Sequence, residues 1–246
     1  MTTTAILSAL GEEQQGLLER LQHSEKSNHA GRDFWRGELH GQPVVLALSR
    51  IGKVAAATTA TALIEHFGAG RIVFTGVAGG VGEGVQVGDV VVADEFIQHD
   101  MDASPIFPRY EVPLYGKTRF ACDAGLSRLL LQASRAGLDS LALPSRTLLH
   151  HGLVASGDRF VSGARESHTL RSSLQQGGHE VLAVEMEGAA VAQVCFDYGV
   201  PFAAVRTISD RADDTAHVDF PVFVRDVASL YAQEIVRHFL GLLPKR

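Results

Sequence analysis

Acidic side chains occur at three places in this sequence where an apolar run ends. These places are Glu12–Glu13, Glu185–Glu187 and Ser209–Asp210. A carboxylate that is buried at the end of a strand needs a partner. It can transfer a proton, and it can accept hydrogen bonds from both hydroxyl groups of a sugar diol. The three places are therefore the first candidates for chemistry.

Each place also has a structural explanation. Acids in the first turn of a helix are stabilised by the helix dipole, which would account for Glu12–Glu13 and for one acid of Glu185–Glu187. Serine and aspartate commonly cap helices, and for Ser209–Asp210 taken alone a cap is favoured roughly two to one. Two glutamates in one strand-to-helix junction are poorly explained by the dipole, so this pair carries the stronger functional signal.

The run Gly76–Gly80 follows an apolar stretch, and we expect a glycine-rich turn there. Glycine lets a backbone approach a ligand closely, although a tight turn packed against a neighbouring strand explains the run about equally well. No Lys-Ser/Thr pair of a P-loop follows, and the spacing differs from that of a dinucleotide-binding loop.

Histidine and nucleophile motifs give no further site. His99–Asp100 and His150–His151 belong to neither an HExxH motif nor a spaced His/Cys set, so we expect no metal and a structural role. No G-x-S-x-G elbow is present for Ser/His/Asp catalysis.

Composition limits the class of protein. The 246 residues carry a net charge of −6 with a pI near 6.0, which disfavours nucleic acid and anionic membranes as partners. The two cysteines, Cys122 and Cys195, are unpaired in sequence and suggest a reducing compartment. The first ten residues lack a basic leader, and no apolar stretch approaches the ~20 residues of a membrane span. We expect a cytoplasmic protein.

The elements that must position the acids follow from periodicity. Apolar runs predict strands, amphipathic runs predict helices, and we expect residues 1–246 to form a single domain with a mostly parallel sheet covered on both faces. Ligands bind beyond the carboxyl ends of strands in such sheets, where all three acidic places lie. A long irregular segment, 97–121, suggests a functional or interfacial loop. The predicted strands are 5–10, 43–49, 71–75, 89–96, 148–156, 181–184 and 201–208, and the predicted helices are 12–22, 53–66, 126–136, 166–176, 187–198 and 223–242.

Eight segments between residues 8 and 213 together resemble one family. They are SALGEE, SRIGKVAAA, FTGVAGG, VGDVVVADEF, QHDMD, VASGDRFV, AVEMEGAAVAQVC and VPFAAVRTISDRAD. In this order they are similar to the 5'-methylthioadenosine/S-adenosylhomocysteine nucleosidases of the nucleoside phosphorylase superfamily. The resemblance implies an α/β fold with three α/β/α layers and a twisted mixed central sheet, a homodimer, no cofactor, and a place in methionine salvage.

The resemblance also implies a reaction and its residues. The expected reaction is hydrolysis of the N-glycosidic bond of methylthioadenosine and adenosylhomocysteine, which releases adenine; 5'-deoxyadenosine and aminodeoxyfutalosine are the alternative substrates. Asp210 is expected to be the acid at purine N7, which requires a raised pKa, while Glu13 activates water and Glu187 binds the ribose hydroxyls. The expected substrate-binding residues are Leu10, Ile51, Val77, Gly79, Phe160, Val161, Glu185, Met186, Glu187, Ser209 and Phe220, with Ala103, Ile106 or Phe107 supplied by a neighbouring subunit.

Two features depart from the family pattern, and two other functions compete. Val77 stands where some members carry serine, and the stretch 104–118 differs from many relatives, so both bear on substrate preference.

A purine nucleoside phosphorylase would need arginines around phosphate. Arg50 and Arg206 are the candidates, and Glu13 would repel that anion. A non-catalytic nucleoside-binding protein would not need all three acids.

Overall fold

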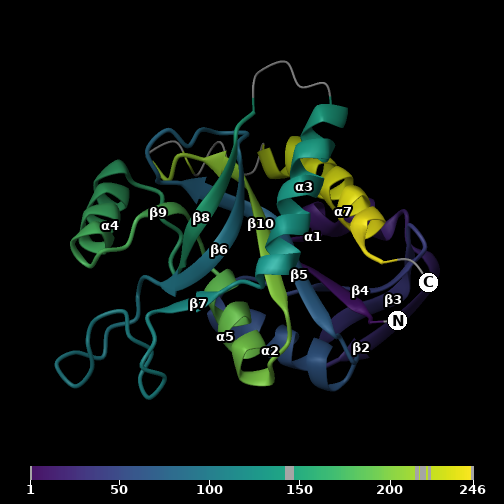
Figure 1. Ribbon diagram of the computed structural model, residues 1–246, viewed down its shortest axis with the longest axis horizontal. Coiled ribbons are helices and arrows are strands. Elements are labelled where there is room, and N and C mark those ends of the chain that lie inside the picture. The colour runs from purple at the N-terminus through teal and green to yellow at the C-terminus, as the bar shows by residue number, and fades with distance from the viewer. Residues whose placement is uncertain (1, 142–146, 214–215, 217–219, 221–222, 245–246) are drawn as a thin grey trace.

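The computed structural model describes residues 2–141, 147–213, 216, 220 and 223–244 (Figure 1). Strands and helices alternate along most of the chain, as predicted. The strands are β1 (Thr4–Ser8), β2 (Gln22–His29), β3 (Arg32–Leu39), β4 (Gln42–Leu48), β5 (Arg71–Gly80), β6 (Val90–Gln98), β7 (Arg119–Ala121), β8 (Leu149–Ser156), β9 (Val181–Glu185) and β10 (Phe202–Asp210). The helices are α1 (Gly11–Leu18), α2 (Lys53–Glu65), α3 (Ala124–Ser140), α4 (Ala164–Gln176), α5 (Gly188–Tyr198), the π-helical turn η1 (Val224–Ala228) and α7 (Ser229–Leu242).

The strands form one mixed sheet in the order β10-β6-β8-β9-β5-β1-β4-β3-β2, with β7 paired to β6. β5 also pairs with β10, so that the sheet closes on itself through β5, β10, β6, β8 and β9. The pairs β1–β5, β5–β10 and β8–β9 are parallel, whereas β5–β9 and β6–β10 are antiparallel. The predicted α/β class with a mixed sheet is confirmed.

Helices cover both faces of the sheet (Figure 1). The small side chains of α2 and α5 pack with Phe74, Phe96 and Phe202 in one apolar cluster. On the other face, α1, α3 and α7 bury leucine, isoleucine and phenylalanine side chains against β1, β4 and β6. These two cores hold the carboxyl ends of the strands in place.

β5 differs from its predicted form. The run Gly76–Gly80 is extended and completes the strand, so the predicted glycine-rich turn is wrong. Residues 71–74 pair with β1, and Gly79–Gly80 pair with β9 on that side. Residues 75–78 lie between these two pairings and pair with neither β1 nor β9. Glycine fits here because other atoms stand where side chains would project: a Cβ at Gly76 would lie 3.0 Å from Glu13 Oε1.

Several elements were not predicted. β2 and β3 follow α1, which ends at Leu18 and not at residue 22. β2 is polar and exposed along nearly all its length, so it carries no alternation of apolar and polar residues. The short β7 lies within the segment 97–121 that was expected to be irregular, and the predicted C-terminal helix begins as η1. None of the helices described here is both long and apolar enough to cross a membrane.

Candidate active site

A cavity of about 410 Å³ opens at the carboxyl ends of β1, β5, β9 and β10. Twelve predicted site residues line it: Leu10, Glu13, Ile51, Val77, Gly79, Phe160, Glu185, Met186, Glu187, Ser209, Asp210 and Phe220. Val161 lines a small pocket beside it, together with Phe160 and Asp210. The three acids therefore surround one shared space. They come from three different strand ends, and each of these strands is a neighbour of β5.

Glu13 is held by backbone amides on the floor of the cavity. Its Oε2 accepts from the N–H groups of Ala9 and Leu10 at 2.8 and 2.9 Å, and its Oε1 accepts from Val77 N–H at 3.1 Å. Val77 lies on the stretch of β5 between its two neighbouring strands, which leaves this N–H for the carboxylate. Burial raises the pKa of Glu13, while the three amides and the Arg206 cation oppose that rise. The result is a strengthened base with a fixed orientation.

The helix-start interpretation of Glu13 is correct as well. Glu13 is the third residue of α1, and its bond to Leu10 N–H satisfies a free donor at the start of the helix. The same contact that begins the helix therefore fixes the carboxylate toward the cavity.

Glu187 follows β9 and precedes α5. Its Oε1 accepts from Gly52 N–H at 2.8 Å, at the start of α2. Burial and the neighbouring charge of Glu185 raise the pKa of Glu187 to about 8, against the opposing effects of Gly52 N–H and Arg206. A carboxyl group with one tied oxygen and one face on the cavity can accept hydrogen bonds from a diol.

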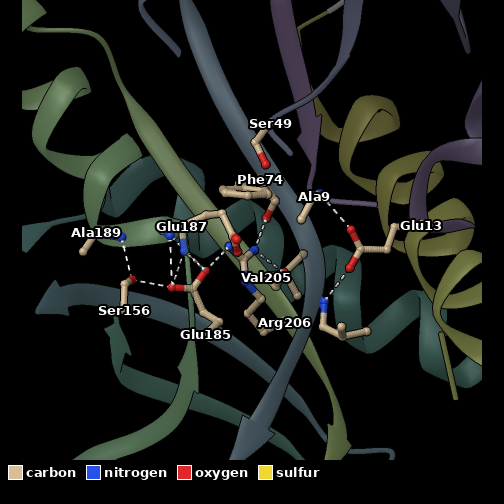
Figure 2. A network of polar contacts seen from close by, with 12 residues as sticks. Ala9, Glu13, Ser49, Phe74, Ser156, Glu185, Glu187, Ala189, Val205 and Arg206 are labelled. Atoms are coloured by element: carbon tan, nitrogen blue, oxygen red, sulfur yellow. Dashed lines mark hydrogen bonds and ion pairs between the residues drawn. The ribbon is translucent and has the colours of Figure 1, made fainter. Parts of the chain in front are cut away.

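The Glu185 side chain points into a buried network of hydrogen bonds (Figure 2). Its two oxygens accept from Arg206 at 2.8 Å, from Ser156 Oγ, and from the N–H groups of Glu187 and Gly188. These contacts occupy the acceptor sites of a carboxylate. Glu185 borders the cavity, as expected of a substrate-binding residue, and its direct contact with substrate stays a prediction. The contacts of its carboxylate hold the strand-to-helix turn that presents Glu187.

Arg206 lies inside the protein with 1% of its surface exposed. Besides Glu185, its guanidinium donates to the carbonyl oxygens of Phe74 and Val205 at 3.1 Å and stacks 4.1 Å from the Phe74 ring. It supplies positive charge near Glu13 and Glu187, and its own charge is matched by Glu185. Arg50, the other candidate for a phosphate-binding arginine, donates to the carbonyl oxygen of Gly31.

Asp210 reaches the cavity through a β-bulge. Ile208 pairs with Ala78 and Asp210 with Gly79, so that Ser209 is an extra residue on β10. Adjacent residues of a regular strand face opposite ways, but the bulge allows both Ser209 and Asp210 to line the cavity. Ser209 Oγ donates to Asp210 Oδ2 at 2.7 Å, and Ala212 N–H donates to Oδ1 at 2.8 Å.

A glycine and two aromatic rings complete the site next to Asp210. A Cβ on Gly79 would lie 3.0 Å from Asp210 Oδ1 and from Ala212 Cβ, so a larger residue there would press against Asp210. Phe160 is 42% exposed, and its ring meets that of Phe220 edge to face, with centroids 5.5 Å apart. An apolar ring on the wall of a cavity provides a face against which a flat heterocycle can stack.

The residues expected from a neighbouring subunit lie elsewhere. Ala103, Ile106 and Phe107 belong to the irregular stretch after β6 and do not line the cavity. Ile106 is 82% exposed. Within the residues that the structure describes, no group of three or more His, Cys, Asp or Glu side chains is placed to hold a metal ion.

Sequence reasoning overlooked several contributors. Ala9, Ala78 and Val184 line the cavity but carry no chemistry that a sequence could reveal. Gly52 N–H and Ser156 Oγ hold Glu187 and Glu185. Their only signal was position, since both lie at or just beyond strand ends.

Comparison with known proteins agrees with this geometry. The family model of the phosphorylase superfamily matches residues 3–241. The 5'-methylthioadenosine/S-adenosylhomocysteine nucleosidase of Geobacillus kaustophilus (strain HTA426) is 35% identical over 243 residues, which cover 98% of each chain. A solved structure of the nucleosidase of the same name from Neisseria meningitidis, in complex with methylthio-immucillin-A, has a TM-score of 0.88 at 34% identity, covering 99% of this chain and 100% of that one.

A further solved structure, the native futalosine hydrolase of Helicobacter pylori strain 26695, has a TM-score of 0.87 at 31% identity and covers 98% of both chains. The likeness extends over nearly the whole length in sequence and in fold. The chain therefore belongs to the phosphorylase superfamily and, within it, to the family of the 5'-methylthioadenosine/S-adenosylhomocysteine nucleosidases.

Proposed function

We propose that this protein hydrolyses the N-glycosidic bond of 5'-methylthioadenosine and S-adenosylhomocysteine and releases adenine. The observation that carries the proposal is the meeting of Glu13, Glu187 and Asp210 around one cavity beside an exposed phenylalanine ring. Family membership supports the same reaction.

The residues divide the reaction between them. The bond from C1' to the purine breaks, its electron pair goes to adenine, and protonated Asp210 gives a proton to N7. Glu13 takes a proton from the water whose oxygen bonds to C1', so that adenine and the 5'-substituted ribose are the products. Glu187 holds the ribose hydroxyls and favours the positive charge that builds on the sugar. Acid and base on opposite sides of the sugar, with water between base and C1', form an inverting arrangement.

Hydrolysis is favoured over phosphorolysis by the charges at the site. A phosphorylase needs uncommitted cations for the phosphate dianion. Arg206 is buried and paired with Glu185, Arg50 donates to a backbone carbonyl, and Glu13 stands on the cavity floor. We expect a negatively charged floor of this kind to exclude phosphate and admit water.

The test is adenine release from 5'-methylthioadenosine in phosphate-free buffer. We expect full turnover without phosphate, and free 5-methylthioribose as the sugar product. Turnover that begins only when phosphate is added, with a sugar 1-phosphate as product, would reverse the choice. The same assay with S-adenosylhomocysteine, 5'-deoxyadenosine and aminodeoxyfutalosine would rank these substrates by turnover. The ranking would show the substrate preference on which Val77 and the stretch 104–118 bear.

We also propose a homodimer in which Ala103, Ile106 or Phe107 of one subunit closes the 5' end of the other subunit's cavity. Ile51, Val54 and Ile106 are apolar and 57%, 79% and 82% exposed, and contact with a second subunit would remove them from water. We expect sedimentation to give about twice the 26.4 kDa of one chain, and Ile106→Glu to dissociate the dimer and raise KM. A monomeric wild-type protein with full activity would contradict this.

The single domain and the cytoplasmic location remain proposals. All ten described strands join one sheet, and the cavity lies at the ends of four of them, which supports a single domain. Both cysteines are buried and free, which supports a reducing compartment.

A further inference from the structure

Three loops that meet beside the cavity are tied together by Lys53, Asp100 and Asp158, which we call the Lys53 clamp. Lys53 Nζ donates to Asp100 Oδ1 at 2.6 Å, and Asp158 N–H donates to Asp100 Oδ2 at 2.9 Å. The ring closes where Lys53 N–H donates to Asp158 Oδ1 at 2.7 Å. The loops follow β4, β6 and β8, so each comes from a different strand end.

The clamp stands at the start of α2, where the helix lacks a cap of its own. Gly52 occupies the cap position with φ +96° and has no side chain to satisfy the free N–H groups of the first turn. Two acids from other loops take the place of a cap side chain: Glu187 accepts from Gly52 N–H, and Asp158 accepts from Lys53 N–H. A Cβ at Gly52 would lie 3.1 Å from Asp158 Oδ1, so Asp158 packs directly against that turn.

Lys53 also reaches the helix that follows Glu187. Its Nζ donates to Gln98 Oε1 at 3.0 Å, and Gln98 Nε2 donates to Gln193 Oε1 on α5 at 2.8 Å. The lysine side chain is only 15% exposed. Although burial acts in the other direction, Lys53 and Asp158 N–H hold the pKa of Asp100 below its usual range. Asp100 is therefore the charged partner that keeps Lys53 in place.

We propose that the Lys53 clamp is a set of positioning residues that hold Gly52 N–H against Glu187 and thereby set the affinity for the ribose. The inference rests on the proposed role of Glu187. None of the three side chains lines the cavity, so they act through Gly52 and through the segment that carries Phe160, two residues after Asp158. Without the clamp, the start of α2 is free to withdraw from Glu187.

Loss of the Gly52 donor changes the acidity of Glu187 in a known direction. A hydrogen bond to the ionised form favours that form, and Gly52 N–H lowers the pKa of Glu187 against the effect of burial. Its removal raises that pKa further. If ionised Glu187 accepts the ribose hydroxyls, the acid limb of the kcat/KM profile moves to higher pH.

The test compares Lys53→Met, Lys53→Arg and Asp158→Ala with wild type in the adenine-release assay. We expect Lys53→Met and Asp158→Ala to raise KM about threefold to tenfold, the effect of one lost hydrogen bond, and to move the acid limb upward. Lys53→Arg keeps the cation and recovers most of the affinity. Asp33→Ala, which breaks the Lys26–Asp33 pair of 2.8 Å on strands β2 and β3, outside the cavity lining, serves as the matched control and leaves KM unchanged.

A double-mutant cycle separates positioning from general loss of structure. In a Glu187→Gln background, Lys53→Met should change KM little, because the group on which it acts is gone. An undiminished effect there, or an unchanged KM and acid limb in both Lys53→Met and Asp158→Ala, would overturn the inference while leaving the proposed function in place. Wild-type KM and turnover in Glu187→Gln itself would overturn both.

Discussion

Asp210→Asn should lower turnover of 5'-methylthioadenosine by about 10²- to 10⁴-fold while the protein still binds the nucleoside. That range is typical for the loss of a positioned acid. Asparagine keeps the shape of aspartate: its Oδ1 can accept from Ala212 N–H, and its amide Nδ2 can donate to Ser209 Oγ, which accepts as well as donates. It cannot protonate the leaving adenine. Single-turnover adenine release measures the chemical step, and calorimetry with the intact nucleoside measures binding.

Glu13→Gln provides the complementary case, and Asp139→Asn the control. Glutamine at position 13 can accept on one atom only, so it loses both the base and part of the contact with Ala9, Leu10 and Val77. We expect a similar loss of turnover with binding retained. Asp139 is exposed on α3, away from the cavity, and its substitution should change neither quantity. Wild-type turnover in Asp210→Asn or Glu13→Gln would defeat the roles assigned to these acids.

The convergence of the three acids could be predicted because each of them follows a predicted strand. Once a parallel arrangement is inferred, residues that follow different strands must converge at one edge of the sheet. Glu13, Glu187 and Asp210 all satisfied that condition, and the structure places them around one cavity. Convergence at an edge does not specify what each side chain contacts, which is why Glu185 was grouped with Glu187. Only the positions of Arg206 and Ser156 separate the two glutamates.

Other features could not be predicted because they depend on neighbours that are distant in sequence. Gly76–Gly80 resembles a turn locally, yet it is held extended by β10 on one side and by β9 at its end. The bulge at Ser209 appears only in the register of β10 against β5. β2 has no apolar face to detect, because it is an edge strand that pairs only with β3 and faces solvent.

Arg206 links the stability of the protein to its site, and Arg206→Met should reduce the free energy of unfolding by about 3–5 kcal/mol. Removing one partner of a buried ion pair leaves the other charge without compensation. Here that charge is Glu185, whose side chain is 3% exposed, and the carbonyl oxygens of Phe74 and Val205 lose a donor as well. Urea titrations at neutral pH measure the loss as a lower midpoint with an unchanged slope.

The double variant Glu185→Gln/Arg206→Met tests whether the loss comes from the unpaired charge. It should be more stable than Arg206→Met alone, because no buried charge is left without a partner. Arg237→Met is the matched control, since its pair with Glu234 is partly exposed and such pairs contribute under about 1 kcal/mol. An Arg206→Met variant that loses no more stability than Arg237→Met would contradict the argument.

Arg206 also lowers the pKa values of Glu13 and Glu187. Activity in the folded Arg206→Met protein should therefore begin at a higher pH, which ties the buried cation to both carboxylates of the site.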